Sequence, residues 1–165
     1  MPGARSSRPA AFLFVCVAAS ACSIEPRTDR PVLPADTTSQ SEFLRPWGDS
    51  VPPAGVRSGD LVWVWRMAGT VPGAAPERLV EGGAAAETRQ AAANVLAVLE
   101  EAGGSLEDLA QCSLFVTDGA DLEAARAAYV EALGIPPTRV ALASDGLALG
   151  ARVELECTAV LSEGA

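Results

Sequence analysis

The sequence predicts one α+β domain in which two amphipathic helices cover one face of a mixed β-sheet. Three observations support this prediction. The length of 165 residues suits one domain, and a content of 49% hydrophobic and 20% charged residues suits a buried core. Strand-like runs with period-two alternation flank two stretches with helical spacing. Their order, ββαβαββ, favours a layer of helices packed on a layer of strands.

Residues 1–21 resemble an export signal. Arg5 and Arg8 precede a short apolar run at residues 10–19, and small residues continue to Cys22, as in secretory signals. The sequence ASAC that ends at Cys22 resembles the bacterial lipobox. We therefore expect an acylated Cys22 that anchors an exported lipoprotein to a membrane of the cell envelope, facing the periplasm or the cell surface. The alternatives are a secreted protein without a lipid and an uncleaved anchor.

Residues 22–48 precede the predicted domain at residues 49–165. They are rich in Pro, Ser, Thr and charge without periodicity, which predicts a flexible tether. All twelve basic residues of the chain are arginine, and without the signal ten of them remain beside 21 acids, a net charge of −11. This charge repels phosphate backbones, so we expect no nucleic-acid partner.

The strands of the domain are predicted from alternation and β-propensity. A weak strand at residues 51–57 precedes a strand at 60–69, which is rich in Val and Trp. A third strand is expected at 110–117. Two further strands, joined by a Gly-rich loop, close the domain between residues 136 and 160.

Two helices are predicted, at residues 84–102 and 121–133. Each carries apolar residues at helical spacing and stops at glycine. Between them, Ser105 and Asp108 form the pattern of a capping box for a short helical turn. The sheet face without helices carries apolar as well as polar residues, so we expect a symmetric homo-oligomer to cover it.

Two cysteines, Cys112 and Cys157, remain inside predicted strands after the signal and the lipid site are set aside. They are either two buried thiols, which we favour, or a disulfide of the kind that exported proteins form. The chain has no histidine and no CxxC pair, so we expect no metal site. A nucleophile activated by histidine is excluded.

The residues best suited to chemistry lie on the two closing strands. Arg139 belongs to the first and Glu154, fifteen residues later, to the second, and alternation places each on the less uniformly apolar side of its strand. A guanidinium offers two parallel donors to a carboxylate and stays charged. A positioned carboxylate can accept a proton from attacking water. The alternative is a structural ion pair.

Four segments, in this order and spacing, resemble the Rid family (RidA/YjgF) of imine deaminases. They are GDLVWV (59–64), ETRQAAANVLAVLEEAGGSLEDLAQCSLFVTD (87–118), AAYVEALG (127–134) and PPTRV with GARVELECTAV (136–160). The resemblance spans residues 51–161. It implies a chorismate-mutase-like fold, a homotrimer with clefts between subunits, and no cofactor.

The resemblance also implies an activity and roles for the two charged residues. The reaction is hydrolysis of an enamine or imine, such as 2-aminoacrylate, to the 2-keto acid and ammonia. Arg139 then grips the substrate carboxylate and Glu154 orients the water. Orientation and modest acid–base help suffice for so labile a substrate.

Several cleft positions differ from the family pattern. Trp65 and Arg66 stand where active members have Ser-Gly, and the Tyr that commonly precedes GDLV is missing. Arg126 replaces an Asn of the second helix, and Ala141 replaces a small polar residue. We expect Arg66, Arg126 and Ala141 to form part of a rebuilt substrate-binding wall.

Two functions follow from this sequence. The first, which we favour, is an exported, membrane-anchored hydrolase of reactive enamines and imines. The alternative is a non-catalytic trimeric module of the cell envelope that binds a small carboxylate or another metabolite.

Overall fold

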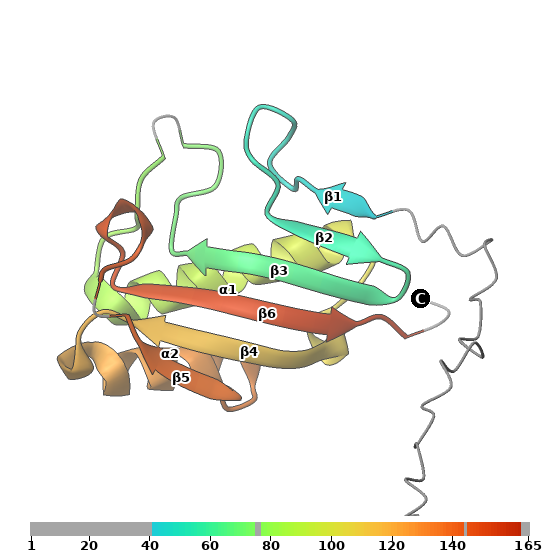
Figure 1. Ribbon diagram of the computed structural model, residues 1–165. Coiled ribbons are helices and arrows are strands. Elements are labelled where there is room, and N and C mark those ends of the chain that lie inside the picture. The colour runs from blue at the N-terminus through green and yellow to red at the C-terminus, as the bar shows by residue number, and fades with distance from the viewer. Residues whose placement is uncertain (1–40, 75–76, 144, 163–165) are drawn as a thin grey trace, which may run out of the picture. The chain divides into compact units, whose positions relative to one another are not determined.

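The computed structural model describes residues 41–74, 77–143 and 145–162, which form one sheet with two helices on one of its faces (Figure 1). The six strands have the order β1-β2-β3-β6-β4-β5. In chain order the main elements are β1 (Glu42–Leu44), β2 (Gly55–Ser58), β3 (Leu61–Ala68), α1 (Gly83–Glu101), β4 (Leu109–Val116), α2 (Leu122–Leu133), β5 (Arg139–Leu142) and β6 (Val153–Val160).

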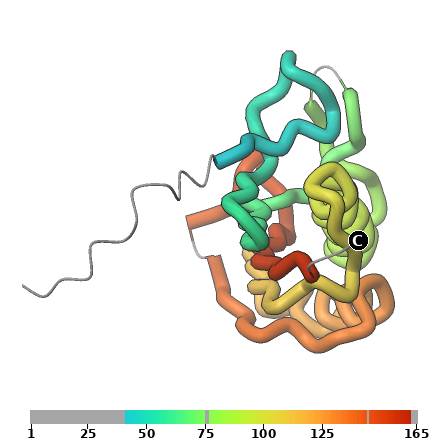
Figure 2. Tube along the Cα trace, turned by 90° about the vertical axis from the view of Figure 1, so that its right-hand side faces the viewer, coloured from blue at the N-terminus to red at the C-terminus, as the bar shows by residue number. Residues whose placement is uncertain are grey.

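The observed architecture confirms the predicted fold class. All neighbouring strands are antiparallel except β4 and β5, so the sheet is mixed. Figure 2, turned by 90°, shows both helices on the same side of the sheet. The expected capping box of Ser105 and Asp108 is present at a short 3-10 turn, Leu106–Asp108. No helix of the described segments is both long and apolar enough to cross a bilayer.

The sheet begins earlier than the sequence predicts. β1 lies within the stretch assigned to the tether, its Leu44 is 1% exposed, and the carbonyl of Leu44 accepts a 2.8 Å hydrogen bond from the Ala54 N–H. The domain boundary at residue 49 is therefore too late. A strand of three residues is too short to show alternation, so the sequence carries no signal for it. The signal at 1–21, Cys22 and the tether up to residue 40 lie outside the described residues.

Helix α1 fixes the end of β3, next to the functional site described below. The Asn94 side chain donates a 3.1 Å hydrogen bond to the Ala68 carbonyl at the end of β3. Gly69 follows, and a Cβ atom at this position would lie 2.5 Å from the Glu87 carbonyl oxygen. Only glycine allows so close an approach of strand and helix. The Glu87 carboxylate also accepts a 2.7 Å bond from the Arg152 N–H, just before β6.

The two cysteines of the domain form a disulfide, so the favoured expectation of free buried thiols is wrong. Cys112 on β4 and Cys157 on β6 are direct partners in the antiparallel register, with Cα atoms 4.1 Å apart. Both side chains lie in the core between sheet and helices. Each cysteine was placed correctly in a strand, but the register that opposes them is a non-local property.

The sheet face opposite the helices carries exposed aromatic side chains. Trp63 is 41% and Phe43 58% exposed, and the Phe43 ring meets Trp65 edge-on at 6.4 Å. Val160 on β6 is also exposed. An apolar face of this kind, in a chain with an otherwise acidic composition, suits contact with another subunit.

Candidate functional site

Glu154 is the buried carboxylate of the site. It lies on β6, it is 3% exposed, and both of its oxygens are bonded. Oε1 accepts a 3.1 Å hydrogen bond from the Ala148 N–H, in the loop that leads into β6. Oε2 forms a 2.9 Å ion pair with Nε of Arg66. The carboxylate is thus held in one orientation by a backbone amide and a guanidinium.

A β-bulge brings Arg66 to Glu154. The register between β3 and β6 shifts between Val64 and Met67, and Trp65 and Arg66 are both exposed within this interval. Bulges commonly re-aim side chains near functional sites. Regular alternation would send two consecutive residues to opposite faces, so the contact was not evident from the sequence.

Phe115 joins the two arginines of the site. Its ring lies below the guanidinium of Arg66, with 4.2 Å from Cζ to the ring centroid, and 5.7 Å from Cζ of Arg139. On β4, Phe115 is the direct partner of both Glu154 and Ala141. Cation–π contacts of this length stabilise a guanidinium over a ring. The sequence reasoning missed Phe115, although alternation along residues 110–117 places it on the face opposite Cys112.

The predicted site residues fall into two groups in the structure. Arg139, Glu154, Arg66 and Ala141 come together around Phe115 on one face of the sheet. Arg126 instead belongs to α2 in the helix layer, where it is exposed. Among the described residues, no hydrogen bond or ion pair joins Arg126 to Arg139 or Glu154.

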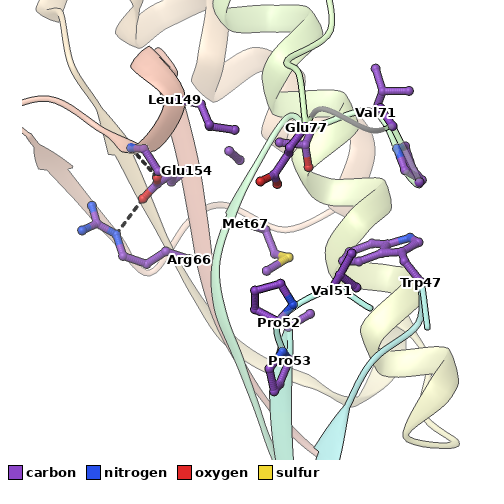
Figure 3. A pocket seen from close by; sticks show the side chains of 17 residues that line it. Trp47, Val51, Pro52, Pro53, Arg66, Met67, Val71, Glu77, Leu149 and Glu154 are labelled. Carbon is purple, nitrogen blue, oxygen red and sulfur yellow. Dashed lines mark hydrogen bonds and ion pairs between the residues drawn. The ribbon is translucent and has the colours of Figure 1, made fainter. Parts of the chain in front are cut away.

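A pocket of about 340 Å³ opens beside Glu154 (Figure 3). Its walls come from the β1–β2 connection, the end of β3, the loop after it and the loop before β6. In the view of Figure 3, Arg66 lies on one side of Glu154 and the apolar walls lie on the other. The apolar walls include Trp47, Pro52, Met67, Val71 and Leu149.

Leu149 adopts an unusual backbone conformation at this pocket. Its φ of 57° is the only positive φ outside glycine among the described residues, and Leu149 follows Ala148, whose N–H holds Glu154. A branched side chain in this region is strained, and such strain gathers at functional sites. The loop therefore presents an apolar side chain and a backbone donor at the same point.

The chemistry available here is that of a carboxylate, two guanidiniums and an apolar pocket. Within the described segments, no group of three or more His, Cys, Asp or Glu side chains is arranged to hold a metal ion. The exposed guanidinium of Arg66, 45% accessible at its side chain, can accept an anionic ligand next to Glu154.

The fold and the site together define an α+β protein of the chorismate-mutase-like type, with two arginines and a buried carboxylate on one face of its sheet. A family profile described as Endoribonuclease L-PSP matches residues 53–161. The chain belongs to this family, the Rid (YjgF) family, and the resemblance noted in the sequence is confirmed.

Two curated relatives come from Schizosaccharomyces pombe. Protein mmf2, mitochondrial, is 34% identical over 108 residues, which cover 63% of this chain and 82% of mmf2. Protein mmf1, mitochondrial, is 34% identical over 87 residues, which cover 50% of this chain and 54% of mmf1. The match to mmf1 thus spans about half the length of that protein.

Solved structures show the same fold. RidA from the Antarctic bacterium Psychrobacter sp. is 26% identical, with a TM-score of 0.62 over 72% of this chain and 98% of that one. E. coli TdcF, solved with bound serine, has a TM-score of 0.62 at 22% identity over 73% of this chain and 99% of that one. At this identity TdcF supports the fold alone.

Proposed function

We propose that the protein is a RidA-like hydrolase that converts reactive 2-imino acids and their enamine tautomers to 2-keto acids and ammonia. The observation that carries this proposal is the meeting of Arg139 and Glu154 on one sheet face, around the ring of Phe115. One group binds the substrate carboxylate and the other activates water. Family membership supports the same role.

The proposed reaction uses only the groups of this site. The substrate carboxylate binds Arg139, with the outer nitrogens of Arg66 beside it. Glu154 accepts a hydrogen bond from water and orients the oxygen towards the imine carbon. The water oxygen adds to this carbon as Glu154 takes one proton from the water and passes it to the imine nitrogen, which becomes an amine. Glu154 then moves the hydroxyl proton of the resulting carbinolamine to the amine nitrogen as the C–N bond breaks, which releases ammonia and leaves the keto group.

We further propose that the active protein is a homotrimer, exported and anchored through a lipid on Cys22. The exposed aromatic face around Trp63 and Phe43 supports an assembly. The Cys112–Cys157 disulfide supports export, because disulfides persist in oxidising compartments. We do not propose RNA cleavage, since the chain without residues 1–21 has a net charge of −11, which repels phosphate.

One observation favours a second function, that of a carboxylate-binding module without turnover. Both oxygens of Glu154 already have donors, from Ala148 and from Arg66. Glu154 then serves to hold Arg66 in place, and the two arginines over Phe115 bind an anion. In this case the ligand leaves unchanged.

The test measures release of ammonia and keto acid from imino acids that an amino-acid oxidase generates in situ. We expect the purified protein to accelerate hydrolysis. Glu154→Gln keeps the size and the acceptor towards Ala148 but removes the charge, and we expect it to lower kcat by about 100-fold or more. Arg139→Ala is expected to raise KM by about tenfold or more, because it removes the carboxylate ligand.

Arg89→Ala is the matched control. Arg89 is an exposed arginine of α1, paired with Glu131 on the helix layer, so its loss changes the net charge without touching the site. If the protein binds 2-keto acids but does not accelerate hydrolysis, the hydrolase proposal is wrong and the carboxylate-binding module is supported. Equal rates in the wild type and Glu154→Gln would remove Glu154 from the mechanism.

A further inference from the structure

The pocket beside Glu154 has the character of a binding site for an apolar group. It holds about 340 Å³, and most of its walls are apolar side chains, among them Trp47, Met67 and Leu149. Glu154 itself lines the pocket, so this space adjoins the carboxylate that acts on water in the proposed reaction. Ligand pockets of this kind combine apolar walls with a few placed polar groups.

We propose that the substrates are 2-imino acids with a bulky aliphatic or aromatic side chain, which the pocket receives, rather than the small 2-aminoacrylate. This inference rests on the proposed function and specifies its substrate class. A compound with a two- or three-carbon skeleton would leave the walls around Trp47 and Val71 without contact.

The order of chemical groups across the site matches the order within such a substrate. In Figure 3, Arg66 lies on one side of Glu154, and Met67, Val51 and Trp47 lie on the other. A 2-imino acid carries its carboxylate and its side chain on opposite sides of the imine carbon. A carboxylate near Arg66 and a side chain near Met67 place that carbon close to Glu154.

Leu149 is the wall residue nearest in sequence to the donor that holds Glu154. Its φ of 57° lies in the left-handed region, where glycine or asparagine would be less strained than leucine. The loop thus retains a strained leucine that lines the pocket. Apolar contact between its side chain and a ligand explains why a leucine occupies this strained position.

Charge around the pocket argues against acidic side chains. Glu77 lies at the wall, is exposed, and Figure 3 shows its carboxylate on the pocket side. A second carboxylate in the substrate would meet Glu77 and Glu154 together. Like charges at this range disfavour binding.

The test compares the affinities of three 2-keto acids, as product probes, by calorimetry: pyruvate, 4-methyl-2-oxopentanoate and phenylpyruvate. We expect phenylpyruvate to bind about tenfold or more tightly than pyruvate, because apolar pockets discriminate by this order. Leu149→Asn places a polar residue that tolerates positive φ, and we expect it to lower this ratio about threefold or more. Val71→Ser, in the loop after β3, is a second pocket variant with the same expectation.

Leu106→Asn is the control, since Leu106 is an exposed apolar residue of the 3-10 turn after α1 and does not line the pocket. It should leave the ratio unchanged. Equal affinities for pyruvate and phenylpyruvate, or a ratio that both pocket variants leave intact, would overturn the inference even if hydrolysis is observed.

The hydrolysis assay separates this inference from the proposed function. A larger kcat/KM for the phenylalanine-derived imine than for the alanine-derived imine supports both. Hydrolysis of both imines at equal kcat/KM supports the proposed function and overturns the substrate class. Absence of hydrolysis overturns the proposed function and, with it, the substrate class. If phenylpyruvate still binds more tightly than pyruvate in that case, the pocket binds apolar groups but the protein is not a hydrolase.

Discussion

Arg66 changes the surroundings of Glu154 in this chain. In the family pattern a Ser-Gly pair stands at positions 65 and 66, and glycine permits close approach of a ligand to the backbone. Here the guanidinium binds Oε2 of Glu154 at 2.9 Å and rests on Phe115. The ion pair orients the carboxylate and adds a second cation beside Arg139. Arg139 and Glu154 therefore lie in a site that carries two guanidiniums.

Tyr129 carries a buried hydroxyl whose environment is unfavourable for stability. It is fully buried, and its hydroxyl has no hydrogen-bond partner among the described residues. We expect Tyr129→Phe to raise the free energy of unfolding at neutral pH by about 1 kcal/mol, because it removes an unsatisfied polar group. Chemical denaturation measures this change, and a loss of stability would reveal a partner for the hydroxyl.

The same burial predicts a pH dependence. Desolvation disfavours the phenolate and raises the pKa of Tyr129 from 10.0 to about 12. Above pH 10 the unfolded chain ionises first, so stability is complete below pH 10 and falls as the pH rises towards 12. Tyr129 is the only tyrosine, so ultraviolet absorbance of the phenolate follows this one group. A midpoint near 10 in the folded protein, or an identical alkaline loss in Tyr129→Phe, would contradict the assignment.

At the scale of elements, the disulfide joins two neighbouring inner strands, β6 and β4, on the helix-facing side of the sheet. Strand β4 carries Phe115 and β6 carries Glu154, on the sheet face opposite the helices. The Cys112–Cys157 disulfide links the same two strands on the helix-facing side. Because the two cysteines are 45 residues apart in sequence, the crosslink restricts the unfolded chain. The disulfide thus supports the strand pair on which the site depends.

We expect reduction of this disulfide to lower the free energy of unfolding by about 2–4 kcal/mol. The measurement is urea denaturation with and without a reductant. The Cys112→Ala, Cys157→Ala double variant is the control, because its stability should not respond to the reductant. Reactive thiols at Cys112 and Cys157 in the unfolded, unreduced protein would show that the disulfide does not form.

Strand β1 extends the domain into the segment that looked like a tether. Leu44 packs in the core, whereas Glu42, at the start of the same strand, is exposed. We expect Leu44→Ala to lower the free energy of unfolding by about 2–5 kcal/mol, and Glu42→Ala to change it by less than about 0.5 kcal/mol. Thermal or urea denaturation measures both. Equally small stability changes in both variants would show that residues 42–44 belong to the tether and not to the folded domain.

At the scale of the whole molecule, we expect the aromatic sheet face to form the contact between subunits of the proposed trimer. Trp63 lies near its middle, on β3, with Thr158 of β6 and Val56 of β2 as its strand partners. We expect the wild type to have the mass of a trimer by light scattering. Trp63→Arg should dissociate it, because a charge cannot be buried unpaired at such an interface.

Leu106→Arg adds the same charge on an exposed turn outside this face and should remain trimeric. A monomeric wild type at micromolar concentration would rule out the trimer. Hydrolysis should fall with dissociation, since the proposed clefts lie between subunits.

Much of the architecture was predictable because it depends on local pattern. The helix at 84–102 is observed as Gly83–Glu101, and the helix at 121–133 as Leu122–Leu133. The alternation that separated Val153 and Leu155 from Glu154 also holds, since the former pack in the core. The same two-residue alternation predicted on which face of the sheet Arg139 and Glu154 lie.

The remaining features depend on how distant segments meet. The sequence by itself determined the two helices, the long strands, their faces and the charged pair, because periodicity and glycine positions act within a few residues. The tertiary structure alone decided the register that opposes Cys112 and Cys157, the bulge that brings Arg66 to Glu154, and the pairing of β1. Strand register and bulges are set by pairing across the sheet, where a shift of one residue reverses every side chain. Local sequence carries little of that information.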